Sequence, residues 1–439
     1  MGLFFGTDGL RGIVNKDLTQ NIAFKIGNAL SVLKKNPKVL IGSDTRISGP
    51  FIALAVASGV MSGGGNAKDL GVVPTAGVAY LTKKLGYDYG VVISASHNSG
   101  EYNGIKVFGS EGYKLGEKEE EQIERCFLNE KINSYPDIGT YSQELNAIKL
   151  YRDFLISSSK NAFKGKTVVL DCAHGASHKI APEVFKKLGA KVIASHATGN
   201  GLKINDNCGA LYPANLKSRI LRYKANVGFC FDGDSDRLIV VDEHGEVVNG
   251  DKIICALAKY YKNLGKLKED TVVGTSHTNM GIENELKENG INLIRTDIGD
   301  KYVLAKLVEK NLTLGGEQSG HIILKELATT GDGILSAIAV LNMMIDLNKS
   351  ASELFAVDLY PQINVNVIVK DKFRILNSEL LAKAVVKHNV ALSGRGRIMV
   401  RASGTEPKVR IMVESKDRAV NEEIAKDLEN VVRSIDAEN

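Results

Sequence analysis

The sequence predicts an α/β protein with largely parallel sheets, followed by a smaller α+β domain. Short runs rich in Val and Ile end in polar, glycine-rich loops and are followed by helical patterns, as in residues 38–62, 167–189 and 271–289. Strands that alternate with helices form parallel sheets, whose functional loops lie at the carboxyl ends of the strands. Residues 363–370 and 396–415 instead alternate apolar and polar side chains like antiparallel strands.

Helix signals and chain length divide the sequence further. In residues 18–35 apolar side chains recur on one helical face, and a closing helix is expected from about residue 417. A chain of 439 residues is expected to form three or four domains. The rhythm of strands and helices places them at residues 1–150, 151–250, 251–363 and 364–439.

Composition argues against several kinds of partner. The net charge of +5 is spread without a dense basic run, so small anionic ligands are expected and nucleic acid is not. The longest apolar stretch, residues 334–347, is too short and interrupted to span a membrane. Five scattered cysteines without C-x-x-C spacing favour a reduced setting, and the first ten residues lack signal-peptide features. We therefore expect a cytoplasmic protein.

The densest chemical signal is the segment FCFDGDSDRLIVVD, residues 229–242. Asp232, Asp234 and Asp236, here named the aspartate triad, can turn their carboxylates toward one point of an extended segment or loop. Three such charges need a hard divalent cation to lie close together. A solvated acidic turn is the alternative, but apolar residues on both sides favour a buried segment. The segment therefore predicts a metal site.

A calcium-binding EF-hand loop is a second alternative for the triad. Glu243 falls at the twelfth position counted from Asp232. The sixth position of such a loop is normally Gly, whereas Arg237 stands here, and both flanks are strand-like instead of helical. The EF-hand is therefore disfavoured.

Residues 94–104, the serine loop, have the sequence SASHNSGEYNG and directly follow an apolar run. A serine hydroxyl is a weak nucleophile until a base, a metal or nearby dipoles activate it. A phosphate on Ser96 could complete the coordination of a cation held by the triad. The G-x-S-x-G pattern of α/β-hydrolases is absent, and a structural turn whose hydroxyls cap local amides is the alternative. We expect Ser96 and the triad to form one phosphoryl-transfer centre.

Two further loops carry groups suited to a phosphosugar. The loop within residues 401–410 offers guanidinium groups, hydroxyls and bare amides that can hold a phosphate, from Arg401, Ser403, Gly404, Thr405 and Arg410. A plain β-turn is the alternative there. Glu317, Ser319 and His321 lie in another strand-end loop and suit hydrogen bonds to sugar hydroxyls, although polar glycine-rich turns are common on surfaces.

The combined motifs resemble those of the α-D-phosphohexomutase superfamily. FGTDGLRG, GSDTRISG, ISASHN with NGIK, DGDSDR, GGEQSGH, TTGDG and RASGTEPKVRIMVE occur in the family's order and cover nearly the whole chain. The resemblance implies three α/β domains with mixed sheets and a smaller C-terminal α+β domain around a central cleft. It also implies an isomerase that transfers a phosphoryl group within a hexose phosphate.

The resemblance implies a role for each matched residue. Ser96 would carry the phosphoryl group and, with Asp232, Asp234 and Asp236, would bind Mg²⁺. Arg237 would assist near the phosphoserine, and Glu317 and Ser319 would contact sugar hydroxyls. The phosphate that is not transferred would be held by Arg401, Ser403, Gly404, Thr405 and Arg410. Acid–base help or charge stabilisation is implied for Arg11, Lys106 and His321, and His97 is a catalytic candidate as the neighbour of Ser96.

Within the superfamily the chain is most similar to members that convert glucosamine 6-phosphate to glucosamine 1-phosphate, toward UDP-N-acetylglucosamine and cell-wall precursors. In that reaction the phosphoserine donates to the sugar, glucosamine 1,6-bisphosphate turns around, and the other phosphate returns to the serine. Mannose and glucose phosphate mutases share every catalytic element and remain an alternative, as do a metal-dependent phosphohydrolase and an inactive sugar-phosphate-binding protein. A homodimer is a family expectation, and no membrane partner is expected.

Three positions depart from the family pattern. Ser99 stands where Pro is usual, so the serine loop lacks the fixed φ of proline. Tyr102 stands where Asp is common. Lys301 replaces an arginine, which would change a bidentate contact into a point charge.

Overall fold

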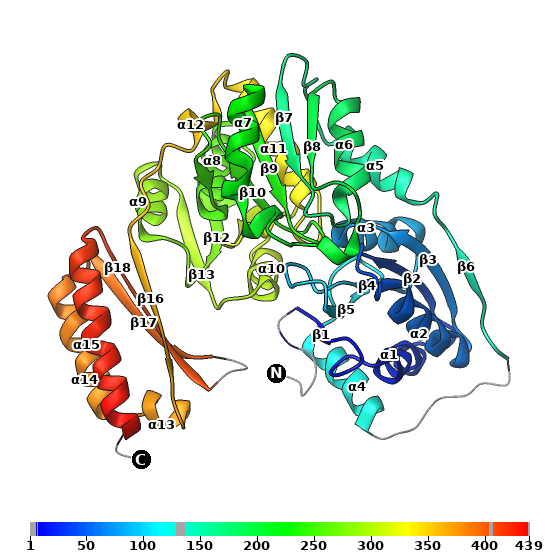
Figure 1. The fold of residues 1–439 in the computed structure, drawn as a ribbon, viewed down its shortest axis with the longest axis horizontal. Helices are drawn as coiled ribbons and strands as arrows, with labels where there is room; N and C mark the ends of the chain where they lie inside the picture. Colours follow the sequence, from blue (N-terminus) through cyan, green and yellow to red (C-terminus); the bar gives the residue numbers. More distant parts are fainter. Residues whose placement is uncertain (1–5, 7, 129–136, 404–406, 438–439) are drawn as a thin grey trace. The chain divides into compact units, whose positions relative to one another are not determined.

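The protein is described by a computed structural model, which covers residues 6, 8–128, 137–403 and 407–437 (Figure 1). The chain forms two compact units that are described separately. The first comprises residues up to 278 together with 286–356, and the second comprises residues 279–285 and those from 357 onward. Within the described residues the first unit contains three sheets and the second contains one. The predicted class of α/β domains followed by a smaller α+β domain is confirmed.

The first sheet is mixed, in the order β1-β5-β4-β2-β3-β6. Its strands are Leu10–Ile13 (β1), Lys38–Ser43 (β2), Asn66–Val72 (β3), Tyr89–Ile93 (β4), Tyr102–Gly109 (β5) and Tyr141–Gln143 (β6). Its helices are Gln20–Leu33 (α1), Gly49–Ser62 (α2), Thr75–Leu85 (α3) and Glu117–Leu128 (α4). In the spatial order β4-β2-β3-β6 the neighbouring strands pair in parallel, as predicted. β5 runs antiparallel to β4, because the serine loop between them is too short for a parallel crossover.

Helix α1 shows how sequence sets these elements. The Thr19 hydroxyl accepts from the N–H of Ile22 at 3.3 Å and so caps the start of the helix. Ile26 and Leu30 are fully buried on its apolar face. The face packs against α2, where a side chain at Gly59 would collide with the carbonyl oxygen of Phe24. The two helices therefore pack with their backbones in close approach.

The second sheet has the order β11-β10-β9-β7-β8, and β7 is parallel to β8 and β9. Its strands are Thr167–Asp171 (β7), Lys191–Ser195 (β8), Val227–Phe231 (β9), Leu238–Val241 (β10) and Val247–Val248 (β11). Its helices are Ile148–Ser157 (α5), Ser177–Lys187 (α6) and Lys217–Tyr223 (α7), with 3₁₀ turns at Gly201–Lys203, Gly209–Leu211 and Pro213–Leu216. The loops after β7, β8 and β9 consequently lie at one edge of the sheet.

The third sheet has the order β13-β12-β14-β15. Its strands are Thr271–Thr275 (β12), Asn292–Thr296 (β13), Leu314–Gly316 (β14) and Ile322–Leu324 (β15). The associated helices are Gly250–Asn263 (α8), Met280–Glu288 (α9), Asp300–Glu309 (α10), Gly333–Asp346 (α11) and Ala351–Leu354 (α12), with a 3₁₀ turn at Lys268–Asp270.

Helix α11 contains most of the longest apolar stretch of the sequence. Every residue from Gly333 to Met344 is buried, and the helix packs against α8, α5, β10 and β15. A helix that is apolar on all sides belongs in a protein core when it is this short. Among the described residues, none of the helices combines the length and apolar character needed to cross a membrane.

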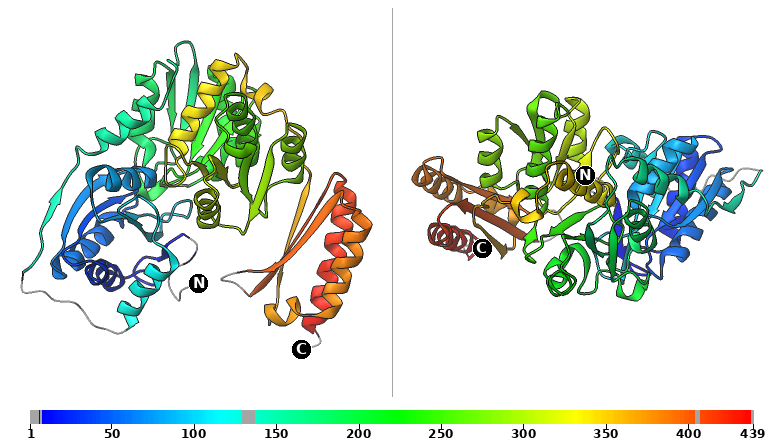
Figure 2. Two further views of the ribbon diagram at one scale, coloured as in Figure 1. Left: turned by 180° about the vertical axis from the view of Figure 1, so that it is seen from behind. Right: turned by 90° about the horizontal axis from the view of Figure 1, so that it is seen from above.

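The second unit is built on an antiparallel sheet in the order β16-β18-β17. Its strands are Gln362–Ile368 (β16), Gly396–Ala402 (β17) and Lys408–Ser415 (β18), and its helices are Lys372–Leu376 (α13), Glu379–Leu392 (α14) and Arg418–Ala437 (α15). Figures 1 and 2 show α14 and α15 side by side along one face of this sheet. The closing helix predicted from about residue 417 is confirmed.

Candidate active site

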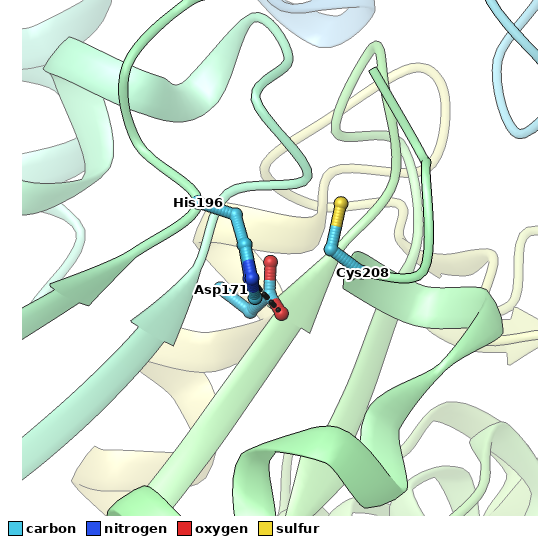
Figure 3. A group of neighbouring side chains, drawn as sticks. All are labelled: Asp171, His196 and Cys208. Carbon is cyan, nitrogen blue, oxygen red and sulfur yellow. Dashed lines mark hydrogen bonds and ion pairs between the residues drawn. The ribbon is translucent and has the colours of Figure 1, made fainter. Parts of the chain in front are cut away.

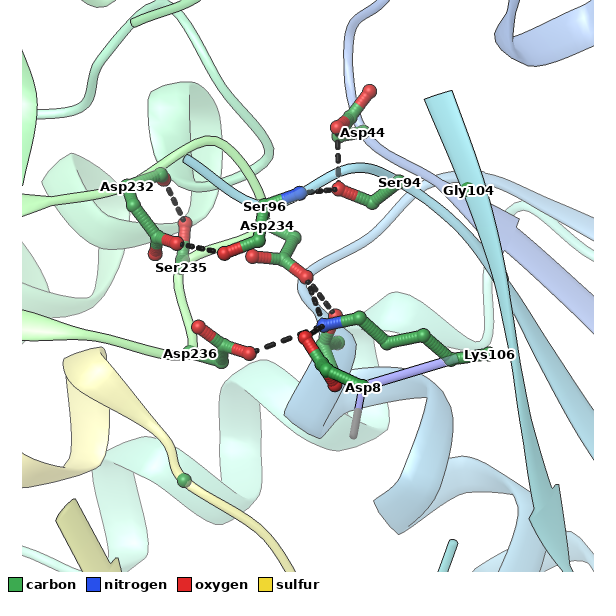
Figure 4. Close-up of polar contacts among 12 residues, drawn as sticks. Asp8, Asp44, Ser94, Ser96, Gly104, Lys106, Asp232, Asp234, Ser235 and Asp236 are labelled. Atoms are coloured by element: carbon green, nitrogen blue, oxygen red, sulfur yellow. Dashed lines mark hydrogen bonds and ion pairs between the residues drawn. The ribbon is translucent and has the colours of Figure 1, made fainter. Parts of the chain in front are cut away.

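Ser96 is buried in a tight turn directly after β4. Its φ of 51° lies in the left-handed region, which a non-glycine residue adopts only when its surroundings enforce it. The Ser96 N–H donates to the Ser94 hydroxyl oxygen at 2.9 Å, and that hydroxyl donates to Asp44 Oδ2 at 2.5 Å. Ser94 therefore performs the local capping that the structural-turn alternative assigns to the loop. The Ser96 hydroxyl points away from Ser94 and toward Asp232 (Figure 4).

The Ser96 hydroxyl joins the serine loop to the aspartate triad. It donates to Asp232 Oδ2 at 2.6 Å, and His97 Nδ1 lies 3.4 Å from Ser96 Oγ. Gly233 allows this approach, because a side chain there would lie 2.5 Å from the Ser96 carbonyl oxygen. Ser96 and the triad thus lie together, although they are far apart in the sequence.

The aspartate triad is buried and convergent. Asp232, Asp234 and Asp236 are at most 2% exposed, and one carboxylate oxygen of each lies within 4.8 Å of the others. Burial, together with the neighbouring Asp236 and Asp234 carboxylates, raises the pKa of Asp232 well above its usual value. The solvated acidic turn is therefore wrong.

The flanks of the triad also exclude the EF-hand. Strands β9 and β10 precede and follow the triad loop, where an EF-hand would have helices. The Glu243 carboxylate accepts a hydrogen bond from the hydroxyl of Ser352 at 2.5 Å. Glu243 is thus bound to another segment.

Two buried carboxylate oxygens of the triad have no hydrogen-bond partner among the described residues, Asp234 Oδ1 and Asp236 Oδ1. The other oxygen of Asp234 is fully engaged, because it accepts from the Thr75 hydroxyl at 2.7 Å and from Lys106 Nζ at 2.9 Å. Burying an acceptor without a donor raises the free energy of the folded state unless a cation lies nearby. The donor set is all oxygen and anionic, which fits a hard divalent cation.

Lys106 compensates part of this negative charge. Its buried Nζ lies 2.9 Å from Asp234 Oδ2, 3.2 Å from Asp236 Oδ2 and 3.0 Å from Asp8 Oδ2 (Figure 4). Burial alone would lower the pKa of Lys106, but these three carboxylates outweigh it and hold the pKa well above its usual value. Lys106 therefore stays protonated, and its positive charge offsets part of the negative charge of these carboxylates.

Two guanidinium groups complete the surroundings of the serine loop. The Arg11 guanidinium donates to Asn98 Oδ1 at 3.2 Å, and the backbone N–H of Arg237 donates to Asp232 Oδ1 at 3.2 Å. The buried Nε of each arginine has no hydrogen-bond partner among the described residues. Both arginines thus have donors available to an anion.

Burial lowers the pKa of His97 to about 4, and the charges of Arg237 and Arg11 act in the same direction, so His97 is neutral at physiological pH.

The residues of the predicted sugar-binding loop separate into two groups. Glu317 is partly buried and accepts from the N–H of Gly299 at 3.1 Å, and the buried hydroxyl oxygen of Ser319 has no hydrogen-bond partner among the described residues. His321 is 3% exposed and accepts from the N–H of Gly331 through Nε2 at 3.1 Å, while Nδ1 lies 3.7 Å from Asp236 Oδ2. His321 therefore lies against the triad.

The predicted phosphate anchor lies in the second unit. Arg401 and Arg410 are directly paired across β17 and β18, and Arg410 donates to the Ser403 hydroxyl at 3.3 Å. Burial and the neighbouring Arg410 lower the pKa of Arg401. Two adjacent cations of this kind favour an anion between them. Gly404 and Thr405 lie outside the described residues.

The structure also reveals contributors that the motif reading left without a role. The guanidinium of Arg46 is buried and donates to the carbonyl oxygens of Ser96 at 3.1 Å, Asn98 at 2.7 Å and Tyr102 at 2.8 Å. Its Nε donates to Asp44 Oδ2 at 2.9 Å, which neutralises the buried charge. Arg46 stands in the GSDTRISG motif, so the sequence held a signal for it.

Asn205 reaches the same carbonyl groups from the second sheet. Its amide donates to the carbonyl oxygens of Ser96 at 2.8 Å and Asn98 at 2.9 Å. Its own N–H donates to the carbonyl of Ala173 at 3.1 Å. The serine loop is therefore clamped by donors from two sheets.

The departures at Ser99 and Lys301 are accommodated locally. The carbonyl oxygen of Ser99 accepts from Arg46, which restrains the backbone where proline is usual. Lys301 forms an ion pair with Glu117 at 2.8 Å, at the start of α4. Lys114 forms ion pairs with both Asp8 and Asp300.

The fold and this site define a phosphohexomutase: three mixed α/β sheets, a small antiparallel domain, and a buried serine against a carboxylate triad. The chain belongs to the phosphoglucomutase/phosphomannomutase family, whose alpha/beta/alpha domains I, II and III match residues 2–134, 144–245 and 249–360 and whose C-terminal domain matches 365–431.

A curated relative that is named more specifically, the phosphoglucosamine mutase of Alkaliphilus oremlandii, is 44% identical over 98% of this chain and 99% of its own.

Solved structures share the fold at lower sequence identity. A phosphoglucomutase/phosphomannomutase family protein from Burkholderia thailandensis has a TM-score of 0.82 at 21% identity, covering 98% of this chain and 97% of its own. Aspergillus fumigatus N-acetylphosphoglucosamine mutase, in complex with GlcNAc-6P and magnesium, has a TM-score of 0.69 at 19% identity, covering 99% and 96%.

Asn205→Ala is expected to loosen the serine loop. The carbonyl groups of Ser96 and Asn98 would lose a donor, lowering the local opening free energy by about 1–2 kcal/mol and speeding amide exchange in residues 94–104 roughly 5- to 30-fold. Hydrogen exchange measured by mass spectrometry checks this. Asn207→Ala is the matched control, because Asn207 has a similar φ, 49° against 59°, and its amide donates to the exposed Asp206. Equal exchange in both variants would contradict the clamp.

Proposed function

We propose that the chain is a phosphoglucosamine mutase, which interconverts glucosamine 6-phosphate and glucosamine 1-phosphate through a phosphoserine and a 1,6-bisphosphate. The observation that carries the chemistry is the buried Ser96 hydroxyl, 2.6 Å from Asp232 Oδ2 within a convergent carboxylate triad. The choice of sugar is supported by near full-length relatives of that name at 44% identity. Such a product is used in making UDP-N-acetylglucosamine and cell-wall precursors.

Mg²⁺ is the cation we assign to the triad. Asp232, Asp234 and Asp236 would hold it together with a phosphate on Ser96. The two triad oxygens without hydrogen-bond partners support this assignment, as does the magnesium bound by the Aspergillus fumigatus enzyme. When bound, the ion supplies positive charge to the phosphoryl oxygens during transfer.

The protein's own groups position the phosphoryl group and its charge. Transfer breaks the bond between phosphorus and Ser96 Oγ and forms one to a sugar hydroxyl oxygen, whose proton ends on Ser96 Oγ. In the return step the phosphoryl group at the other end of the bisphosphate leaves its sugar oxygen for Ser96 Oγ, and the serine proton ends on that sugar oxygen. Asp232 Oδ2 accepts from the free Ser96 hydroxyl and is placed to hold the serine proton when the phosphoryl group returns. Arg11 and Arg237 have buried donors available for phosphate oxygens.

The remaining loops bind the substrate in this proposal. Glu317 would accept hydrogen bonds from sugar hydroxyls, and Ser319 would donate one to them. Burial raises the pKa of Glu317. Arg401, Ser403 and Arg410, with Gly404 and Thr405, would hold the phosphate that is not reacting. One anchor of this kind serves either end of the bisphosphate. The domain boundaries, a homodimer and a cytoplasmic location stay predictions.

A coupled assay that compares glucosamine, glucose and mannose 6-phosphates tests the proposal. The expected result is formation of the 1-phosphate with the highest kcat/KM for glucosamine 6-phosphate and no release of inorganic phosphate. Preference for mannose or glucose phosphate would indicate the alternative mutases. Phosphate release would indicate a hydrolase, and binding without turnover an inactive sugar-phosphate-binding protein.

Ser96→Ala is expected to abolish mutase turnover, because it removes the phosphoryl carrier. Intact mass should show a singly phosphorylated fraction in the native protein and none in the variant. The fold should survive, and circular dichroism checks this. Ser99→Ala, in the same loop, is the control and should remain phosphorylated. Turnover like that of the wild type in Ser96→Ala would refute the role of Ser96.

Asp234→Asn is expected to weaken Mg²⁺ binding by roughly 10- to 100-fold, and activity with it, because one anionic ligand is lost while the shape is kept. Calorimetric Mg²⁺ titration provides the measurement. Asp242→Asn, on the same segment but beyond β10, is the control. A titration unchanged in Asp234→Asn would make the triad structural.

Arg401→Ala is expected to weaken binding of both the 6-phosphate and the 1-phosphate sugar. Loss of a charged hydrogen bond costs about 1.5–3 kcal/mol, while phosphate on Ser96 should stay in place. Both isomers are titrated against phosphorylated enzyme in Mg²⁺-free buffer, with phosphoserine occupancy followed by mass. Arg418→Ala, on exposed α15, is the control. Weakening of one isomer alone would mean that the two orientations use different anchors.

A further inference from the structure

A second group of metal-ligating side chains lies at the edge of the second sheet, outside the aspartate triad. Asp171 ends β7, His196 follows β8, and Cys208 precedes the 3₁₀ turn Gly209–Leu211. One ligand atom from each lies within 4.8 Å of the others (Figure 3). Asp171 and Cys208 are buried, whereas the His196 side chain is 29% exposed. A cation could thus reach the group from solvent.

The donor set differs in kind from that of the triad. A thiolate, an imidazole and a carboxylate together suit Zn²⁺ and similar softer cations, whereas Mg²⁺ prefers oxygen ligands alone. The protein therefore presents two clusters of opposite metal preference at neighbouring strand ends of one sheet. Nothing in the mutase chemistry uses the second cluster.

The three ligands are held by neighbouring groups. Asp171 Oδ1 accepts from the N–H of Ala173 at 3.0 Å, and Oδ2 lies 2.9 Å from His196 Nδ1. The hydroxyl oxygen of Ser195 lies 3.1 Å from the same nitrogen. The hydrogen bond from Ala173 to Oδ1 can orient the Asp171 carboxylate while Oδ2 binds a metal, whereas a cation would replace the contacts of His196 Nδ1. His196 has a left-handed φ of 45°, so its backbone too is fixed by its surroundings.

We propose that Asp171, His196 and Cys208 form a binding site for a soft divalent cation, with Zn²⁺ as the representative ion and water as the remaining ligand. The cation takes the place of the hydrogen bond between His196 Nδ1 and Asp171 Oδ2, the neutral imidazole carries its proton on Nε2, and the thiol proton of Cys208 leaves to solvent. The nitrogen–oxygen separation then widens from 2.9 Å to about 3.3 Å, the edge of a tetrahedron with bonds near 2.0 Å. Burial raises the pKa of the Cys208 thiol to about 12, so the cation has to displace this proton.

Occupancy of this site bears on the serine loop. Residues 196 and 208 are the two ends of the segment that presents Asn205 to the carbonyl oxygens of Ser96 and Asn98. A cation bound to both ends would close this segment into a loop. The soft site would therefore stiffen one half of the clamp around Ser96.

Cobalt binding to the full chain tests the proposal. Co²⁺ is titrated in excess Mg²⁺, so that the triad is occupied, and the thiolate-to-cobalt charge-transfer absorbance in the near ultraviolet is recorded. The triad contains no sulfur and cannot give this signal. We expect saturation at one equivalent and displacement by Zn²⁺. Absence of the band in the wild type would overturn the proposal.

Two variants test the ligands Cys208 and His196, and a third is the control. Cys208→Ser should lose the band, and His196→Ala should lower Zn²⁺ affinity at least about tenfold, whereas Cys126→Ser, at a half-buried thiol on α4, should change neither. A band that persists in Cys208→Ser or disappears in Cys126→Ser would assign the sulfur elsewhere and refute the site. If Cys208→Ser does not fold, His196→Ala decides. Unchanged Zn²⁺ affinity, or an unchanged rise in Tm with Zn²⁺, in that variant would refute the proposal.

Discussion

The first unit depends on one buried ionic contact, in which Lys106 lies between carboxylates from two different parts of the chain. Its ammonium belongs to β5 of the first sheet, while Asp234 and Asp236 belong to the loop after β9 of the second. Removing either side would leave uncompensated charge in the interior, which is strongly destabilising. Asp8 is also paired with Arg11 and Lys114, so the negative charge in excess of Lys106 lies on the triad. This excess of negative charge makes the triad suitable for a cation.

The parts of the fold and site that are local in sequence could be predicted from the sequence. The strand–loop–helix rhythm, the alternating strands after residue 363 and the convergence of Asp232, Asp234 and Asp236 each depend on residues a few positions apart. The mixed character of the first sheet was not visible in the strand pattern, because antiparallel β5 follows from the length of the serine loop. The composition of the serine loop does not indicate the direction of β5.

Residues that act through distant partners were harder to predict. Arg46 and Asn205 serve carbonyl groups roughly fifty and one hundred residues away in sequence, and no periodicity marks such a contact. The sequence pattern suited His321 to sugar hydroxyls and the resemblance implied acid–base help or charge stabilisation, but neither indicated that its imidazole lies against Asp236. Four of the five cysteines are buried, as expected from their apolar neighbours. The arrangement of Cys208 with Asp171 and His196 could not be read from spacing, since it arises at the meeting of two strand ends.

The hairpin formed by β4, the serine loop and β5 carries both Ser96, the proposed phosphoryl carrier, and the lysine that balances the triad. Val92 of β4 pairs with Lys106 of β5, and side chains along a strand alternate between the two faces of a sheet. An insertion or deletion of one residue in the loop would shift this pairing and turn Lys106 to the opposite face. Substitutions such as serine for proline at position 99 leave the pairing intact. Positions such as 99 can therefore vary in this loop while its length stays fixed, because the loop is the spacer between Ser96 and Lys106.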